Sequence, residues 1–499
     1  MEKHNIQKRE CQAIRKVFDA AKDPNKVMIV GIDAAKATHK AAICNGHGDQ
    51  FCKTFNLRND SEGVAFLHAR IDGLCHKFSL LQEHVLVGFE TPGSWAENFA
   101  DTLVTEGLPV INMHPANVKK YRENATTDND KLSAQTICRC LNQKEGSQRL
   151  VDDTYSELLM FSRHHGRLIR QRTQTTNRIT TFCDMYFPGL LDTQKSGIPC
   201  FTEPGLKVLE KLSIHLVRKM SARQLAERLA RYGLPKPQQK AQQLKQLSHK
   251  ALAPTPEKER CMQFEINNLI QQYRLLCDQI DRAFQEMACL LRQTPLALLT
   301  TICGIGVSLA AQITAEVYGR DRHQGAEGKV NYAGLSARGL QTGGDQKPWK
   351  RQGKARKINR HAKRIILMAS ESVAIHDHGE LTQYYQVRKL SGKNAKCALG
   401  RKLFRFCDKL LDAPQAYLPA TLRDGCATPE LLADYYTTLA EKLETKWKRV
   451  TKKPPRQQDV LEQWMDMICN LYHVDFGSIR NHSTSQETTT KRGQTQTAT

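Results

Sequence analysis

The order of apolar runs in residues 27–114 limits what this chain can fold into more than any other feature. Three strand-like runs come first, separated by Asn, Gly, His and Asp residues that favour turns: 27–33, 39–45 and 49–57. Two further strand-like runs, 84–90 and 109–114, alternate with helical patterns at 61–75 and 94–107. A meander followed by alternating helices and strands predicts a mixed α/β sheet flanked by helices. RNase H-like domains have this order, although other α/β folds share parts of it.

Two long helices are predicted in the middle of the chain, at 152–187 and 256–293. In the second, apolar residues recur alternately every four and three positions, which is a heptad seam: Met262, Ile266, Leu269, Tyr273, Leu276, Ile280, Ala283, Met287 and Leu290. Because such a seam needs a partner helix, we expect either an antiparallel hairpin with the first long helix or a coiled coil between subunits. The intervening residues 188–255 combine Pro and Gly with short basic helical runs, and we expect them to form an insertion.

A further helical region is predicted for residues 296–412. Within it, segment 298–319 has two helical runs joined by Gly-Ile-Gly, as in a helix-hairpin-helix, whose hairpin amides can bind a phosphate. An ordinary turn between two helices is the alternative. Residues 413–475 predict two more amphipathic helices, and the Ser-, Thr- and Gln-rich residues 476–499 are expected to be disordered.

The chain is strongly basic. Its 499 residues contain 74 Lys and Arg against 51 Asp and Glu, which gives a formal net charge of +23. The 40% of hydrophobic residues exclude a mainly disordered protein, and no stretch approaches the roughly 20 apolar residues of a membrane span. We therefore expect a cytoplasmic, nucleoid-associated protein whose partner is nucleic acid rather than a membrane surface. The 16 cysteines lack the paired spacing of zinc ligands and are expected to be reduced and mostly buried.

Acidic residues occupy positions where a metal site can form. Asp33 ends the first predicted strand, Glu90 ends the fourth, and Asp128 and Asp130 begin the helix after the fifth. Carboxylates at adjacent strand ends and at a helix start converge at one edge of a sheet, where they can hold two Mg²⁺ ions for phosphodiester displacement. A single Asp after a strand is usually a solvated loop residue, whereas several in this order in a basic chain indicate a site.

Seven motifs then occur in order along the chain: GIDAAKATH, ETPGSW, INMHPANVKKYRE, DKLSAQTI, LTTICGIGVSLAAQI, YAGLSARGLQTGG and KRQGKARKINRHAKRIIL. Together they resemble the DEDD transposases of insertion-sequence family 110, which also includes the Piv-type DNA invertases. The resemblance covers roughly residues 26–190 and 290–412, and the ordered set is far more specific than any single motif.

The resemblance implies a RuvC-like domain whose four acidic residues bind Mg²⁺, and a C-terminal domain that supplies a serine for strand exchange. It also implies DNA as the substrate, an RNA that pairs with target and donor DNA, and a homo-oligomer, either a dimer or a tetramer. The implied organisation is an N-terminal extension (1–25), a RuvC-like domain (26–150), coiled-coil helices (151–295) with the insertion at 188–255, a transposase domain (296–412), a helical extension (413–475) and a tail (476–499).

Carried over residue by residue, the resemblance assigns the first three acidic positions to Asp33, Glu90 and Asp130. The fourth position falls on Ser133, where the family has an aspartate. Serine is a neutral and weak metal ligand, so one Mg²⁺ ion should bind more weakly unless Asp128 takes over the role.

The nucleophile position falls on Thr342, in LQTGG, where a serine is usual. A threonine hydroxyl can attack a phosphodiester, although its methyl group crowds the approach. Ser336 is nearby and is the alternative nucleophile. For both residues, a loop hydroxyl bonded to its own backbone is the simpler interpretation. The downstream motif also departs from the family, with Asn359 where a glycine is usual.

A basic run directly follows this loop, where a nucleic-acid backbone has to pass. Its members, expected to bind nucleic acid, are Trp349, Lys350, Arg351, Lys354, Arg356, Lys357, Arg360, Lys363 and Arg364. Trp349 can stack on an unpaired base or pack beneath the lysine stems. No recognition helix is evident in the sequence, which fits a protein whose target is read by an RNA.

Three functions are compatible with these patterns. The first is an active, Mg²⁺-dependent DNA transposase or recombinase, guided by RNA. The second is a decayed relative that binds nucleic acid without exchanging strands, because Ser133 and Thr342 both depart from the family. The third is a RuvC-like nuclease or junction resolvase that uses the N-terminal domain alone, against which the C-terminal motifs argue.

Overall fold

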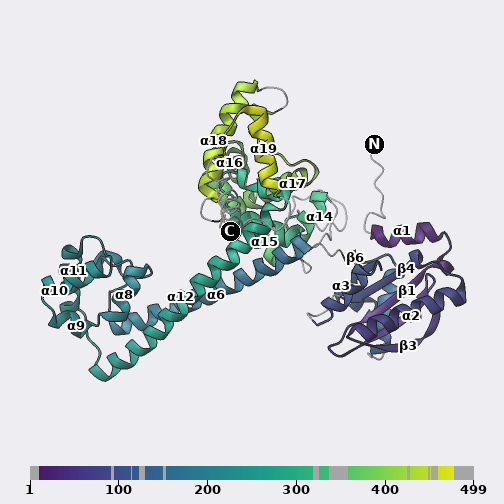
Figure 1. Ribbon diagram of the computed structural model, residues 1–499, viewed down its shortest axis with the longest axis horizontal. Coiled ribbons are helices and arrows are strands. Elements are labelled where there is room, and N and C mark those ends of the chain that lie inside the picture. The colour runs from purple at the N-terminus through teal and green to yellow at the C-terminus, as the bar shows by residue number, and fades with distance from the viewer. Residues whose placement is uncertain are drawn as a thin grey trace, which may run out of the picture. The chain divides into compact units, whose positions relative to one another are not determined.

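The computed structural model describes residues 11–90, 95–113, 115–122, 130–149, 153–318, 325–336, 358–392, 394–423, 427–447, 450 and 459–476 (Figure 1). The chain divides into two compact units: residues 1–156 with 313–413, and residues 157–312 with 414–499. Among the described residues, no helix combines the length and the apolar character that crossing a membrane requires.

A six-stranded mixed sheet forms the N-terminal part of the first unit (Figure 1). Its strands are β1 Met28–Asp33, β2 Thr38–Asn45, β3 Gln50–Arg58, β4 Val85–Glu90, β5 Val110–Met113 and β6 Ser147–Gln148. They lie in the order β3-β2-β1-β4-β5-β6, antiparallel within β1–β3 and parallel from β1 through β4 to β5. The structure confirms the predicted mixed sheet, and its order is consistent with an RNase H-like fold. Strand β6, paired antiparallel with β5, was not predicted because two residues carry no alternation.

Helices cover both faces of this sheet because successive strand residues point to opposite sides. Met28, Val30 and Ile32 pack against α2 (Ser61–Phe78) and α3 (Glu97–Thr105). Val27 and Ile29 pack on the other face, against α1 (Gln12–Ala21), α4 (Pro115–Arg122) and α5 (Asp130–Asn142). Two short 3-10 helices, η1 (Pro24–Lys26) and η2 (Gln82–His84), lead into β1 and β4.

The two predicted long helices are present as α6 (Asp153–Tyr186) and α12 (Pro256–Arg292), and they lie side by side (Figure 1). Arg178 Nη2 is 2.7 Å from Glu265 Oε1, and the rings of His165 and Phe284 are 6.1 Å apart. A residue further along α6 therefore meets a residue earlier in α12, so the helices are antiparallel. Of the two predicted arrangements, the chain forms the hairpin with itself.

The insertion consists of five short helices at one end of this pair (Figure 1). They are α7 Thr193–Ser196, α8 Glu203–Lys211, α9 Ile214–Lys219, α10 Ala222–Arg231 and α11 Pro237–Lys250. The first half of the α12 seam, with Ile266 and Leu269, packs into a core that the insertion helices share with the end of α6, whereas Ile280 and Ala283 in the second half pack against Leu168 of α6. The heptad seam thus has two different partners.

The remaining elements are helical, as predicted: η3 Pro295–Thr301, α13 Val307–Ile313, the π-helix η4 Thr314–Tyr318, α14 Gly325–Tyr332, α15 Arg360–His376, α16 Glu380–Leu390, α17 Ala395–Asp412, η5 Ala420–Leu422, α18 Pro429–Trp447 and α19 Val460–Tyr472. The last two correspond to the two amphipathic helices expected in 413–475. Disorder was expected for residues 476–499; Phe476 is instead buried, and residues 477–499 lie outside the described residues.

The expected helix-hairpin-helix around Gly-Ile-Gly is only partly formed. Its first run is the 3-10 helix η3, because the hydroxyls of Thr300 and Thr301 donate to carbonyls three residues earlier, at 2.7 and 2.6 Å. The Lys446 ammonium donates to the carbonyls of Ile302 and Ile305 at 3.1 Å, and burial lowers the pKa of Lys446 to about 8. The turn is therefore held by a lysine of its own unit, which favours the ordinary turn over a phosphate-binding hairpin.

Candidate functional site

Asp33 and Glu90 lie next to each other at the edge of the sheet. Strands β1 and β4 are parallel neighbours in which Ile32 pairs with Phe89, so Asp33 and Glu90 are the last residues of adjacent strands. Neighbouring strands are about 4.8 Å apart, and both side chains are half-buried. The structure brings the first two predicted carboxylates together; their role in binding metal stays a prediction.

Two glycines allow α5 to approach this edge. Gly31 and Gly88 are paired across β1 and β4, and a Cβ on Gly31 would lie 2.3 Å from the carbonyl oxygen of Ala134. A Cβ on Gly88 would lie 2.7 Å from Leu141 Cδ1. Because Ala134 sits over Gly31 while Cys138 Sγ reaches the carbonyl of Ile29, earlier in β1, at 3.9 Å, α5 runs opposite to β1 and starts near the carboxyl end of that strand. The first residue of α5, Asp130, thus belongs to the same edge as Asp33 and Glu90.

The fourth position of the motif is also at this edge. Ser133 precedes Ala134 and is only 5% exposed. The Asp130 side chain and all of Asp128 lie outside the described residues, and no three His, Cys, Asp or Glu side chains within the described part of the chain gather into a metal site. Two adjacent carboxylates of described residues are the kind of ligand that a divalent cation prefers.

His39 shapes the loop that follows Asp33, and sequence reasoning missed it. Its ring is fully buried, its Nδ1 accepts a hydrogen bond from the Ala35 N–H at 3.1 Å, and its centroid is 4.8 Å from that of Phe99 in an edge-to-face contact. Burial lowers the pKa of His39, so the imidazole is neutral at pH 7. A histidine at the start of an apolar strand was the only available signal.

The described residues that precede and follow the segment with the predicted nucleophile are in contact with each other. The Asn359 N–H donates to the Tyr332 carbonyl at 2.8 Å, and a Cβ on Gly334 would lie 2.7 Å from Ile358 Cγ2. Between them, Thr342 and the basic residues Trp349 to Lys357 lie outside the described residues. The hydroxyl of Ser336 is buried without a hydrogen-bond partner among the described residues.

The remaining basic residues are in the first turns of α15. Arg360 and Arg364 are exposed, and Lys363 is half-buried. This placement leaves two guanidinium groups at the surface in the first turns of α15.

Two family models match the chain. A transposase model of the IS110 DEDD type matches residues 30–188, and the model of the IS116/IS110/IS902 transposase family matches residues 296–386. Together the two matches cover half of the chain. The chain belongs to the IS110 transposase family. No curated protein matches it. The first matched segment of this transposase contains Asp33 and Glu90, and the second contains Ser336 and Thr342. Residues 189–255 of the insertion lie in neither.

Asn359, which replaces the family's usual glycine, has a structural role in this transposase. Its Oδ1 accepts from the N–H groups of His361 and Ala362 at 2.9 and 3.1 Å, which caps α15. Its Nδ2 donates to Glu316 Oε2 at 3.1 Å and to the Tyr332 hydroxyl at 2.9 Å. A glycine makes none of these side-chain bonds, so the departure from the family strengthens the end of the Thr342 segment.

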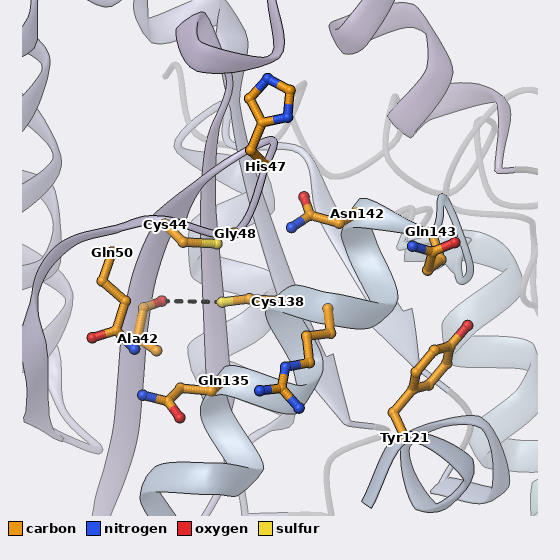
Figure 2. A pocket seen from close by; sticks show the side chains of 11 residues that line it. Ala42, Cys44, His47, Gly48, Gln50, Tyr121, Gln135, Cys138, Asn142 and Gln143 are labelled. Carbon is orange, nitrogen blue, oxygen red and sulfur yellow. Dashed lines mark hydrogen bonds between the residues drawn. The ribbon is translucent and has the colours of Figure 1, made fainter. Parts of the chain in front are cut away.

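A cavity of about 390 Å³ opens beside α5 (Figure 2). It is lined by Ala42, Cys44, His47, Gly48, Gln50, Tyr121, Gln135, Cys138, Arg139, Asn142 and Gln143. These lining residues include no carboxylate, so the cavity does not suit a divalent cation. A hydrogen bond with Cys44, together with burial, raises the pKa of the Cys138 thiol, which makes this cysteine a poor nucleophile.

Proposed function

We propose that this transposase cuts and joins DNA with Mg²⁺ held by Asp33, Glu90 and Asp130. The observation that carries the proposal is the meeting of two strand ends and the start of α5 at one sheet edge. When bound, Mg²⁺ lowers the barrier by polarising the phosphodiester and offsetting the charge that develops on it. The carboxylates would hold the ions. The absence of side chains at Gly31 and Gly88 lets α5 lie close to the sheet.

In the proposed reaction, the Thr342 hydroxyl, with Ser336 as the alternative, gives up its proton and attacks the phosphorus of a DNA phosphodiester. A bond from the side-chain oxygen to phosphorus forms while the bond from phosphorus to one deoxyribose oxygen breaks, and that oxygen takes up a proton and leaves as a free DNA hydroxyl. The described residues on either side of the segment that carries Thr342 are joined by the Asn359 N–H, which donates to the Tyr332 carbonyl, and by Asn359 Nδ2, which donates to Glu316. We propose that the basic run from Trp349 to Arg364 binds the phosphate backbone of DNA or RNA. The exposed Arg360 and Arg364 are suited to such phosphate contacts.

Whether the protein is an active transposase or a decayed relative depends on Ser133, which stands where the family has an aspartate. A buried serine adds no charge to the site, so we propose that one metal binds weakly unless Asp128 supplies the missing carboxylate. If the weakly held metal does not bind and Asp128 does not replace the missing ligand, we propose the second function, in which the protein binds nucleic acid without strand exchange. The family match in the C-terminal segment argues against the third function, a nuclease that uses the N-terminal domain alone.

We further propose a guide RNA and a homo-oligomer, dimer or tetramer, as partners. A formal charge of +23 suits a complex that contains both RNA and DNA. The proposed domain boundaries are those expected from the sequence.

One experiment separates the three functions. The full-length protein is incubated with its flanking DNA, its candidate RNA and Mg²⁺, beside Asp33→Asn as a control. Recombined junctions that disappear in the control support the transposase, binding alone supports the decayed relative, and simple nicking supports the nuclease.

A further inference from the structure

The insertion carries a concentrated positive charge. Residues 214–250, which form α9, α10 and α11, contain nine Lys and Arg and one acidic residue, Glu227, a net charge of +8 in 37 residues. All of these residues are described. The two family models do not match this part of the chain, so the charge is not explained by their assignments.

Only part of this charge is used to hold the fold. Lys245 Nζ donates to the carbonyls of Arg218 and Met220 at 2.9 and 2.7 Å, which satisfies the end of α9. Arg218 in turn donates to the carbonyls of Ser248 and Ala251, both at 2.7 Å, which satisfies the end of α11. These reciprocal caps fix α9 against α11.

Most of the other cations in the segment are at the surface. Arg223 forms a 3.2 Å ion pair with Glu227. No ion pair among the described residues involves the remaining six, which are Lys219, Arg228, Arg231, Lys236, Lys240 and Lys250. A single acid cannot balance them, so the surface of α9–α11 remains strongly positive.

Helices α10 and α11 form a helix-turn-helix. Ser221 and Gln224 make a capping box at the start of α10, and Pro237 begins α11. In the turn between them, Gly233 has φ +86°, a conformation that favours glycine, and Leu234 is buried. The turn chemistry and the packed core make this a defined motif rather than a flexible connection.

The two sides of α11 differ sharply. Ala241, Leu244 and Ser248 are buried against the other insertion helices. One exposed side, which we call the glutamine face, presents Gln238, Gln242, Gln246 and His249 along the helix. These residues follow helical spacing over a helix of 14 residues, about 21 Å. The face carries amides that can both donate and accept, and no carboxylate that would repel a polyanion.

We infer that α10 and α11 bind duplex DNA, with the glutamine face in the major groove. Glutamine can pair with both the N6 and the N7 of adenine, and a B-form major groove admits a helix. Arg228 and Arg231 lie at the end of α10 and Lys236 lies in the turn that leads into α11, where a helix-turn-helix meets phosphates. The deep, narrow major groove of A-form RNA excludes such a helix. This DNA site is separate from the proposed strand-exchange site, so either can fail alone.

The test uses the full-length protein with a pool of random-sequence DNA duplexes, without RNA and with a chelator so that no strand cleavage intervenes. We expect selection of a short, adenine-containing motif of about four to six base pairs. Gln238→Ala/Gln242→Ala/Gln246→Ala should still bind but lose its preference for the motif by about 5- to 150-fold for each glutamine that pairs with an adenine. Gln271→Ala/Gln272→Ala on α12, both exposed, is the matched control and should select the wild-type motif.

A second triple variant tests the phosphate contacts. Arg228→Gln/Arg231→Gln/Lys236→Gln should weaken binding to every duplex and reduce the slope of log affinity against log salt by up to about 2.7. Lys16→Gln/Lys22→Gln/Lys53→Gln, three exposed lysines of the first unit, should leave this slope unchanged. Thermal melting checks that each variant is folded.

Three results overturn the inference. They are the selection of the same motif by the α11 triple variant, a wild-type salt slope in the Arg228 triple variant, and competition by an RNA duplex as strong as that by DNA. Loss of strand exchange has no bearing on these readouts, and their failure leaves the proposed transposase reaction untouched.

Discussion

At the scale of single residues, the partly exposed carboxylates Asp33 and Glu90 contribute charge rather than packing. Asp33→Asn and Glu90→Gln should abolish DNA cleavage, because each removes a negative charge that offsets Mg²⁺. The free energy of unfolding should change by less than about 1 kcal/mol, as for other surface substitutions. A cleavage assay and a urea titration check both statements. Asp19→Asn, exposed on α1, is the control, and wild-type cleavage by either site variant contradicts the assignment.

Ser133 predicts a linked change in stability and metal binding. Without metal, Ser133→Asp should lower the free energy of unfolding by about 1–3 kcal/mol, because it buries an unpaired carboxylate. With Mg²⁺, the new ligand should tighten binding in calorimetry and restore the stability. Ser133→Asn introduces a side chain of similar shape without the charge, and should neither tighten Mg²⁺ binding nor become more stable when Mg²⁺ is added. Unchanged Mg²⁺ affinity in Ser133→Asp implies that Asp128 already fills the role.

His39 predicts a dependence of stability on pH. Burial lowers its pKa in the folded protein below the unfolded value of about 6.5. The unfolded chain therefore binds more protons in this range, and the free energy of unfolding falls as pH drops below about 6.5. Chemical denaturation between pH 7.5 and pH 5.5 should show a smaller fall for His39→Gln than for wild type. Equal slopes in the two proteins contradict this role of His39.

At the scale of elements, the position of α5 on the sheet depends on the absence of a side chain at Gly31. Gly31→Ala should destabilise the protein by about 1–3 kcal/mol, because the new Cβ collides with the Ala134 carbonyl 2.3 Å away and displaces the start of α5. Cleavage should fall with it, since the helix start belongs to the proposed metal site.

Gly73→Ala is the matched control for this prediction. Gly73 lies inside α2, and an added Cβ there meets nothing within 4 Å. The change should therefore stabilise the protein by about 0.5–1 kcal/mol. Thermal melting compares the two variants. If both melting temperatures shift in the same direction, the close approach of α5 to Gly31 is not the cause of the effect.

At the scale of the whole molecule, the proposed reaction needs a hydroxyl from the second family segment and carboxylates from the first. Thr342→Ala should remove strand exchange without removing DNA binding, whereas Thr342→Ser should keep or raise activity because it lacks the hindering methyl group. Mass spectrometry should locate a covalent protein–DNA adduct at residue 342. An adduct at Ser336 moves the nucleophile there, and full recombination by Thr342→Ala rules Thr342 out.

Periodicity in the sequence was sufficient for the main elements and for the two strand ends of the candidate site. Short apolar runs bounded by turn residues marked β1 to β5, and the repeat of the α12 seam required a partner helix. These signals are local, because they depend on which residue types follow one another along a strand or a helix. For the same reason Asp33 and Glu90 could be placed at strand ends before any contact was known.

Only the tertiary structure decided which groups meet across the chain. It gave the α12 seam two partners, placed α5 on Gly31 and Gly88, and bound the Gly-Ile-Gly turn to Lys446. It also separated the buried side of α11 from its glutamine face, which the sequence presents only as a polar, glutamine-rich run. Contacts between distant residues leave no period in the sequence, because they depend on packing distances that are set when the whole chain folds.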